Sequence, residues 1–270
     1  MSPGADRFID TNRNVWDEWT ERRFTPGFQK VERFDAGEEI LQGFEIEELG
    51  PVEGKSLLHL QCHFGLDTLA WARRGAQVTG VDFSDRSIEL ASKLAADLGY
   101  PEARFVRSDV LRLPEVLEGM FDIVYTSFGV LAWLPDLDRW AQVIDRFLAP
   151  GGTFYIAEYH PFPLVFDESG PTFDPTLRNP YFRSSDPIAY SGEEGGEFTV
   201  YGWPYTLGEV VTSLASAGLR IEFLHEFPFS ESPHVGYLVP HEDGTWRLPS
   251  DVDGELPLVF SLRAAKPEDR

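Results

Sequence analysis

The chain has 270 residues, of which 42% are hydrophobic and 14% aromatic, enough to fill the core of one large α/β domain. Its 45 acidic and 23 basic residues give a formal net charge of −22, which repels phosphate backbones and excludes nucleic acid as an expected partner. A single cysteine, Cys62, with six scattered histidines excludes an internal disulfide and a Cys-rich zinc site, so we expect no metal.

From the N-terminus, the sequence predicts two amphipathic helices, because apolar side chains recur among charged ones at helical spacing. We expect them over residues 6–23, with Trp16 and Trp19 among the apolar positions, and over residues 37–49, where Gly50 and Pro51 end the second helix. These helices should pack as a cap, over residues 1–54, on the remainder of the chain.

Residues 55–160 alternate between short apolar runs and helical patterns, which is typical of a parallel, doubly wound sheet. Ser84 is a suitable N-cap for the second helix of this region, and Gly99 ends it. Pro150-Gly151-Gly152 is expected to stop the third helix. Strands are predicted over 56–60, 77–82, 103–109, 121–128 and 153–159, and helices over 65–74, 85–98 and 136–148.

The alternation breaks after residue 160, where prolines, glycines and aromatic residues accumulate up to residue 205. We expect residues 161–205 to form an insertion that acts as a substrate lid. A helix over 206–217, a strand over 219–225, a polar loop near 241–246 and a last strand over 256–264 complete a closing segment, 206–270. No repeat or linker marks a second domain, so the four parts belong to one domain.

Composition also predicts the character of the protein surface and the location of the protein in the cell. No apolar run reaches the length of about eighteen residues that a membrane helix needs, and the polar N-terminus lacks the apolar stretch of a signal peptide. We therefore expect a cytoplasmic protein without membrane contacts, either a monomer or a homodimer. Only four basic residues are lysines, so two interpretations of the acidity stay open: a halophilic host, or a GC-rich genome that favours arginine.

The strongest pattern for function is a buried strand, SLLHL, followed by a turn at Gln61-Cys62-His63-Phe64-Gly65, a helix, and a second strand that ends at Asp82. Free backbone N–H groups at such a turn can approach a ligand, and a carboxylate after the next strand can accept hydrogen bonds from ribose hydroxyls. Asp109 follows the third strand, where an adenine amino group could donate to it. The pattern fits an adenosyl cofactor.

With these motifs, residues 55–160 resemble the core of class I S-adenosylmethionine-dependent methyltransferases, and residues 206–264 resemble its closing strands. LLHLQCHFG stands at the family's glycine-rich turn, GVDFS at its ribose-binding segment and SDV at its adenine-binding segment. The resemblance implies a Rossmann-like, doubly wound sheet of seven strands, mostly parallel, with an antiparallel last strand. The turn departs from the family pattern, because Gln61 and His63 replace its first two glycines. Only the third glycine, Gly65, is retained.

The resemblance also implies the residues that bind S-adenosylmethionine, with S-adenosylhomocysteine as the product. Asp82 would hold the ribose, Phe83 would pack on adenine, and Asp109 with Val110 would bind the adenine edge. Trp16 would close over the cofactor from the N-terminal helix. The full predicted cofactor set is Trp16, Gln61, Cys62, His63, Phe64, Gly65, Asp82, Phe83, Ser84, Asp109, Val110, Thr126, Ser127 and Phe128.

Glu158, Tyr159 and His160 leave the fifth strand at the edge of the expected pocket, so we predict them as candidates for a base or an orienting group. Each residue of both sets also has a structural interpretation, such as helix capping by Asp82 or core packing by Phe83 and Trp16. An acceptor lone pair need only be aligned behind the sulfonium methyl group, so no base is essential. The aromatic insertion predicts a small-molecule acceptor with an apolar or planar surface.

Two other functions remain open at the level of sequence. A nicotinamide-dependent oxidoreductase shares a parallel sheet with an acid after its second strand. Its pyrophosphate needs Gly-x-Gly-x-x-Gly, however, and Gln61, His63 and Leu66 occupy those places. A protein that binds S-adenosylmethionine only as a sensor is the third possibility.

Overall fold

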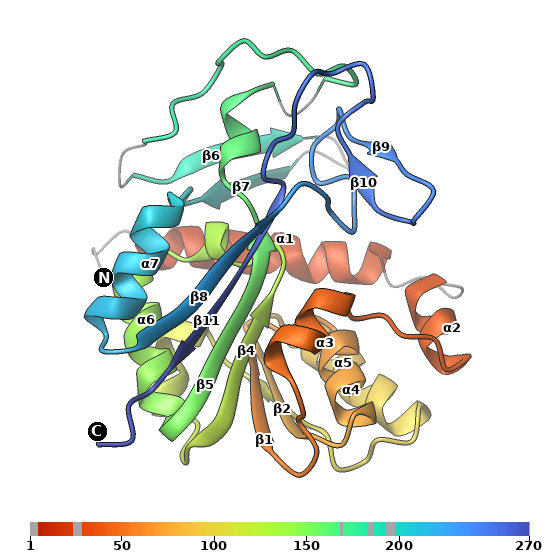
Figure 1. Cartoon of the computed structure of the whole chain (residues 1–270). Coiled ribbons are helices and arrows are strands. Elements are labelled where there is room, and N and C mark those ends of the chain that lie inside the picture. The colour runs from red at the N-terminus through yellow and green to blue at the C-terminus, as the bar shows by residue number, and fades with distance from the viewer. Residues whose placement is uncertain (1–4, 24–28, 168–169, 183–185, 193–197, 270) are drawn as a thin grey trace.

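A single seven-stranded sheet organises the chain in a computed structural model that describes residues 5–23, 29–167, 170–182, 186–192 and 198–269 (Figure 1). The strand order is β3-β2-β1-β4-β5-β11-β8. Strands β1 to β5 pair in parallel, whereas β11 runs antiparallel to both β5 and β8. The predicted Rossmann-like sheet with an antiparallel last strand is therefore confirmed.

The bounds of the elements follow the predicted ones closely in the sheet. The α-helices are α1 (Ala5–Arg23), α2 (Gln29–Asp35), α3 (Gly43–Leu49), α4 (Leu66–Arg73), α5 (Asp85–Asp97), α6 (Leu137–Phe147) and α7 (Leu207–Ser216). The sheet consists of β1 (Ser56–Leu60), β2 (Gln77–Asp82), β3 (Arg104–Arg107), β4 (Phe121–Ser127), β5 (Leu148–Tyr159), β8 (Arg220–Phe227) and β11 (Val259–Ala265). Two hairpins, β6 (Ile188–Gly192) with β7 (Phe198–Gly202) and β9 (Val239–Pro240) with β10 (Trp246–Arg247), and three short 3₁₀ helices, η1 (Val110–Glu115), η2 (Leu131–Trp133) and η3 (Phe162–Val165), complete the fold.

Both faces of the sheet are covered, which explains why its central strands are continuous apolar runs. Along β1, Leu58 and Leu60 face a core built with α6 and α7, whereas Leu57 faces a second core built with α3, α4 and α5. All three side chains are fully buried. The parallel pairing of β1 to β5 brings their carboxyl ends to one edge of the sheet.

Side-chain caps fix where the helices begin. The hydroxyl of Ser84 accepts a hydrogen bond from the backbone N–H of Ser87, and Asp136 caps α6 in the same way. Thr206 and Glu209 form a reciprocal capping box at the start of α7. The predicted starts of these helices are therefore confirmed.

Three local predictions are wrong. The helix expected over 37–49 begins only at Gly43, because Ile40 and Leu41 are buried in an extended segment, and the short α2 before it was not predicted. Pro150-Gly151-Gly152 does not form the break after α6, because α6 ends at Phe147 and this tripeptide lies inside β5. The loop expected over 241–246 is shorter than predicted, because Trp246 already belongs to β10.

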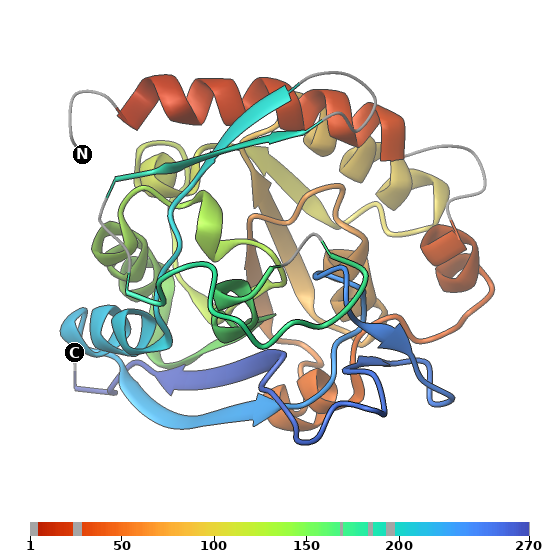
Figure 2. The same ribbon diagram turned by 90° about the horizontal axis from the view of Figure 1, so that it is seen from above.

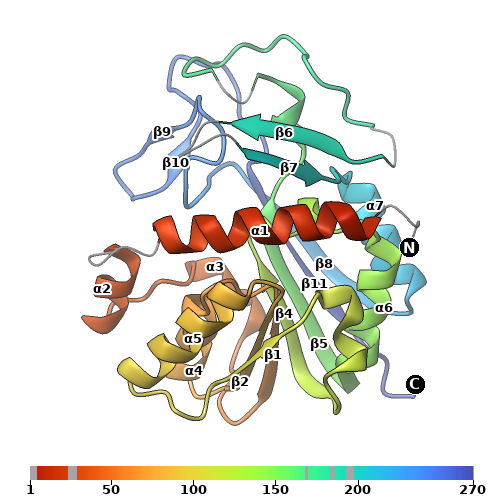
Figure 3. The same cartoon turned by 180° about the vertical axis from the view of Figure 1, so that it is seen from behind.

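Above the carboxyl edge of the sheet, α1 crosses the molecule, with the β6–β7 hairpin alongside it (Figures 2 and 3). The side chain of Asn12 joins the two elements: it donates to the carbonyl of Tyr201 at 2.7 Å and accepts from the N–H of Tyr201 at 2.8 Å. The rings of Phe8 and Tyr201 lie 4.4 Å apart. In the described ranges, no helix is long and apolar enough to cross a membrane.

Candidate functional site

The turn after β1 adopts an unusual backbone conformation. Gln61 and His63 have φ angles of 57° and 52°, and Gly65 has a φ of 78°. Within this turn, space also requires glycine at position 65, because a Cβ on Gly65 would lie 2.5 Å from Cε1 of Phe105. Gln61 and His63 thus take the left-handed conformation at the positions where the family has glycine, at a cost of about 1–2 kcal/mol each.

Asp82, at the end of β2, is bound to this turn. One carboxylate oxygen accepts the backbone N–H of His63 at 2.9 Å, and the other accepts the N–H of Ser84 at 3.0 Å. The side chain is buried, and burial raises the pKa of Asp82 to about 6 even though the backbone hydrogen bonds lower it. A carboxylate held in this way keeps lone pairs in a fixed direction for a ligand.

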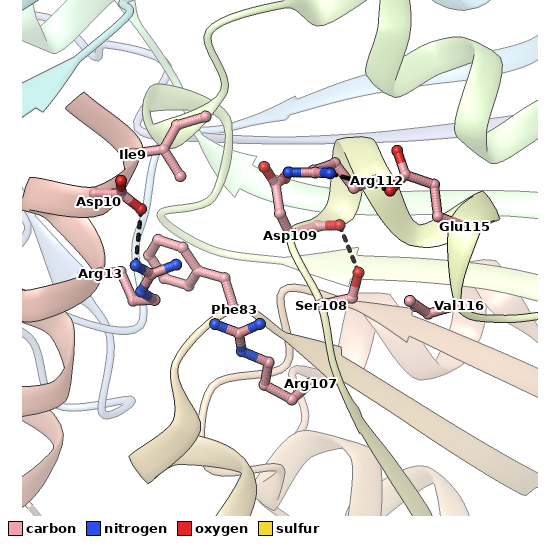
Figure 4. Close-up of a pocket in the computed structure, with 10 residues that line it drawn as sticks. All are labelled: Ile9, Asp10, Arg13, Phe83, Arg107, Ser108, Asp109, Arg112, Glu115 and Val116. Atoms are coloured by element: carbon pink, nitrogen blue, oxygen red, sulfur yellow. Dashed lines mark hydrogen bonds and ion pairs between the residues drawn. The ribbon is translucent and has the colours of Figure 1, made fainter. Parts of the chain in front are cut away.

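Asp109 follows the end of β3 and caps η1, since its carboxylate accepts the backbone N–H of Leu111 at 2.9 Å. It borders a hollow of about 490 Å³ that lies between α1 and residues 107–116. Figure 4 shows the guanidinium groups of Arg13 and Arg107 around the ring of Phe83 in this hollow.

A second cavity, of about 130 Å³, adjoins the hollow, since Ile9, Phe83, Ser108 and Asp109 line both. It lies at the carboxyl ends of β1, β2, β3 and β4, where ligands bind in open α/β sheets. Eight of the fourteen predicted cofactor residues line it: Trp16, Gln61, His63, Asp82, Phe83, Asp109, Val110 and Phe128.

The other six predicted cofactor residues do not line this cavity. The sulfur of Cys62 packs instead against Gly80 of β2, because a Cβ at Gly80 would lie 2.8 Å from it. Thr126 is fully buried and donates to the carbonyl of Leu60 at 3.0 Å. The remaining four are Phe64 and Gly65, which pack in the core beside α4 and α5, the helix cap Ser84, and Ser127, whose hydroxyl lies 3.5 Å from Asp67.

Several residues that line the cavity were not predicted. Ile9 and Asn12 come from α1, and their helical spacing with Trp16 could have indicated that this face of the helix points inward. The others are Val81, Ser108 and a run after β4 that comprises Gly129, Val130, Trp133, Leu134 and Pro135.

Two residues that line the cavity have buried polar atoms, which indicate whether S-adenosylmethionine fits the site. Within the described ranges, Oε1 of Gln61 and Nε1 of Trp16 are buried and have no hydrogen-bond partner. A buried polar group without a partner costs about 1–3 kcal/mol. A ligand with amino, carboxylate and hydroxyl groups would satisfy both atoms, and the carboxylate of Asp82 would accept from hydroxyls, so the residues fit this cofactor.

Glu158 has a different environment from the one predicted. Its carboxylate accepts backbone N–H groups from Gly129, Val130 and Leu131 at 2.5, 2.7 and 3.1 Å, and from Tyr159 at 2.7 Å. Burial raises its pKa, whereas these four hydrogen bonds lower it. Because Gly129 and Val130 line the cavity, Glu158 shapes the cavity wall from behind.

The other two catalytic candidates also lie outside the cavity lining. His160 accepts the N–H of Phe162 at Nδ1, and its Nε2 lies 2.9 Å from Glu226. Tyr159 hydrogen-bonds to the hydroxyl of Ser232 at 2.7 Å. Its ring lies 5.3 Å from that of Phe128, so Tyr159 stands just behind the cavity wall.

Comparison with known proteins matches residues 58–156 to the family described as "Methyltransferase domain". The ubiquinone biosynthesis O-methyltransferase of Paracidovorax citrulli is 32% identical over 112 residues, which cover 42% of this chain and 47% of that protein. An uncharacterized methyltransferase of Synechocystis is 32% identical over 125 residues, or 46% of this chain and 56% of that one. The matches thus span about half the length of these relatives.

Solved structures agree over a longer part of the chain. A putative S-adenosylmethionine-dependent methyltransferase from Listeria monocytogenes superposes with a TM-score of 0.59 at 19% identity, over 83% of this chain and 97% of that one. A methyltransferase from Methanosarcina mazei gives a TM-score of 0.57 at 18% identity, over 84% and 98%. Residues 58–156 therefore match a methyltransferase domain, and the chain has the fold of solved S-adenosylmethionine-dependent methyltransferases.

Proposed function

We propose that the protein transfers the methyl group of S-adenosylmethionine to a small-molecule acceptor. One observation carries the proposal: the carboxylate of Asp82 is fixed to the turn at His63, in the lining of a cavity that Asp109 also borders. This arrangement presents two acids from successive strand ends to one nucleoside. The match of residues 58–156 to a methyltransferase domain supports the same activity.

The cavity residues divide between the parts of the cofactor. Asp82 accepts hydrogen bonds from the ribose hydroxyls, Phe83 and Val110 pack on the adenine, and Asp109 accepts from its amino group. Gln61 and Trp16 supply an acceptor and a donor to the remaining polar groups, and Phe128 flanks the methionine part. Gly129 and Val130 complete that wall.

The bound sulfonium supplies an activated methyl group, so the work of the protein is to orient the acceptor and to exclude water. Orientation alone can supply about 7–11 kcal/mol of the barrier. Helix α1 covers the cavity, and the ring of Trp16 lies 5.3 Å from His63 and 5.4 Å from Trp133. We therefore assign α1 to α3 the role of a cap and the β6–β7 hairpin the role of a lid.

The acceptor is a small molecule with an apolar or planar surface. The aromatic surface beside the cavity comes from three tryptophans, Trp16, Trp19 and Trp133, and from Phe198 of the hairpin, whose ring lies 5.0 Å from Trp19. Most of this surface therefore comes from α1 and η2 rather than from the insertion. The net charge of −22 disfavours nucleic acid.

Calorimetric titration tests the proposal against its alternatives. S-adenosylhomocysteine should bind with one site per chain, and NAD should not. Binding of NAD alone would favour the oxidoreductase. Incubation of the protein with S-adenosylmethionine and a metabolite panel, followed by mass spectrometry, should reveal an acceptor that gains one methyl group; binding without transfer to any metabolite would favour a sensor.

A further inference from the structure

A group of polar side chains lies at the carboxyl ends of β4 and β5, next to the cofactor cavity. Ser127 ends β4 and Tyr159 ends β5, and each adjoins Phe128 or Gly129 of the cavity wall. The hydroxyl of Ser127 lies 3.5 Å from the carboxylate of Asp67 on α4. The methyl acceptor must approach the methionine end of the cofactor, and this group stands at that side of the cavity.

Lys30 of α2 and Asp67 form an ion pair at 3.1 Å in this group. Burial is the largest influence on both pKa values, yet the attraction between the two charges outweighs it, so the pKa of Lys30 is raised and that of Asp67 is lowered. The side chains nevertheless keep 32% and 24% of their surface accessible. The pair is therefore packed against protein and still reachable from solvent; we call the space that Lys30, Asp67, Tyr159 and Glu231 border the crevice.

Glu231 brings a second carboxylate to the same place. One of its oxygens accepts from the side-chain amide of Gln42 at 3.1 Å, and the other has no hydrogen bond or ion pair to the residues that the structure describes. Burial raises the pKa of Glu231, whereas the charge of Lys30 lowers it, but the ion pair of Lys30 is with Asp67. Among the described residues, Glu231 is therefore the carboxyl group of the crevice that no cation contacts, and a bound cation would favour its ionised form.

The wall beside Glu231 is polar and aromatic. The next residue, Ser232, hydrogen-bonds to the hydroxyl of Tyr159, and the ring of His234 stacks on that of Tyr159 at 4.3 Å. Nδ1 of His234 lies 3.0 Å from the hydroxyl of Ser230, and its Nε2 is buried with no partner in the described part of the chain. The segment 230–234 thus offers both a carboxylate oxygen and an unpaired imidazole nitrogen.

We propose that the methyl acceptor is an amine, bound in the crevice of Lys30, Asp67, Tyr159 and Glu231 with its nitrogen on the free carboxylate oxygen of Glu231. This inference rests on the proposed methyl transfer and specifies its substrate class. Since Lys30 and Asp67 neutralise each other, Glu231 makes the crevice attractive to one positive charge. The net charge of −22 adds a field that draws cations toward the protein.

The reaction with an amine balances without another reactant. The bound ammonium first gives one proton to Glu231, which passes it to water. The lone pair of the resulting neutral amine would then form the new carbon–nitrogen bond as the carbon–sulfur bond breaks, and the positive charge moves from sulfur to nitrogen. S-adenosylhomocysteine and the methylated amine leave as products.

The test compares charged and uncharged acceptors of one shape on the full-length protein. Arylalkyl amines, such as 2-phenylethylamine, and their alcohol and carboxylic acid counterparts are offered with S-adenosylmethionine, and methyl transfer is measured by mass spectrometry. Transfer should be confined to amines. Glu231→Gln should raise KM for the amine by about tenfold or more and leave the Kd of S-adenosylhomocysteine within about twofold.

Glu242→Gln is the matched control, because Glu242 is exposed and its replacement removes one negative charge from the loop between β9 and β10. Its KM should match that of the wild type.

The comparison of amine with alcohol uses the wild-type protein alone and holds even if Glu231→Gln does not fold. Failure of S-adenosylhomocysteine to bind would overturn the proposed function and this inference with it. If it binds, transfer to alcohols or acids, no transfer to any amine, or an unchanged KM in Glu231→Gln would overturn the amine inference alone.

Discussion

The carboxylate of Asp82 accepts the backbone N–H of His63 at 2.9 Å, so the acid after β2 is bonded directly to the turn after β1. The left-handed φ of His63 belongs to the turn that brings this N–H to the carboxylate. A turn residue and a strand end that are nineteen positions apart in sequence are thereby joined. The proposed ribose site depends on that link.

The ionisation of Asp82 predicts how cofactor binding depends on pH. Burial raises its pKa to about 6, and in the proposed site ribose hydroxyls would donate to the ionised form. Affinity for S-adenosylhomocysteine should therefore be constant above about pH 7 and fall as the pH drops through 6. At pH 5 about one molecule in ten is ionised, so Kd should be about tenfold higher than at pH 8.

Calorimetry between pH 5 and 8 measures this dependence. Asp82→Asn should bind more weakly at every pH and show a flat profile, because it has no carboxyl group to titrate. An equal slope in Asp82→Asn and the wild type would assign the dependence to another group.

The conformation of His63 predicts that glycine is preferred there to alanine. Both substitutions lose the contact with Thr20 and the ring contact with Trp16, but only alanine keeps a Cβ at a φ of 52°. The free energy of unfolding should be about 1 kcal/mol higher for His63→Gly than for His63→Ala. At the exposed helical position Glu89, the order should reverse by about 1 kcal/mol, and chemical denaturation of the four variants checks both signs.

Gly65 is the position in the turn that should tolerate alanine least. A Cβ there would lie 2.5 Å from Cε1 of Phe105 and 3.0 Å from Cβ of Ala91, at a φ of 78°. Gly65→Ala should lower the free energy of unfolding by about 3 kcal/mol or more. Gly99→Ala has a similar φ of 83° but meets nothing within 4 Å, so its loss should be only about 1 kcal/mol. Equal losses in urea denaturation would contradict the close packing at Gly65.

How far the sequence predicts the fold depends on the kind of element. The parallel strands were predictable because burial on both faces makes them continuous apolar runs, as in β1 and β4. Helix α2 was missed because its seven residues carry few apolar positions. Ile40 and Leu41 misled the prediction in the opposite way, since apolar residues buried in an extended segment resemble a helix face.

The site was predictable where it follows strand ends, and less so elsewhere. Asp82 and Asp109 follow directly from the alternation of strands and helices. The role of Glu158 could not be predicted in this way, because an acid at a strand end gives no information about which neighbours it meets after folding. Glu231 and Lys30 come together from segments about two hundred residues apart, and only tertiary structure shows that.

Replacing Glu158 should lower both the free energy of unfolding and the affinity for the cofactor. Replacing it by glutamine puts an amide N–H₂ against four backbone donors, so Glu158→Gln should lose about 3 kcal/mol of unfolding free energy. Affinity for S-adenosylhomocysteine should fall as well, because Gly129 and Val130, whose N–H groups Glu158 accepts, line the cavity. Exposed Glu255→Gln should change stability by less than about 0.5 kcal/mol. A stable Glu158→Gln with normal affinity would refute the positioning role.

The net charge of −22 predicts that salt stabilises the protein. Repulsion between exposed acids is screened within about 10 Å at 0.1 M ionic strength, so the unfolding midpoint should rise between low salt and 0.5 M KCl. A continued rise into molar KCl would favour a halophilic host, whereas a plateau would favour an ordinary acidic protein. A midpoint that falls on the first addition of salt would contradict the repulsion.

The most direct measurement for the central claim is a crystal structure of the protein with S-adenosylhomocysteine. We predict that the ribose hydroxyls lie within hydrogen-bond distance of the Asp82 carboxylate, with the adenine between Phe83 and Val110. A nucleoside bound outside the cavity that Trp16 and Asp82 line would contradict the account.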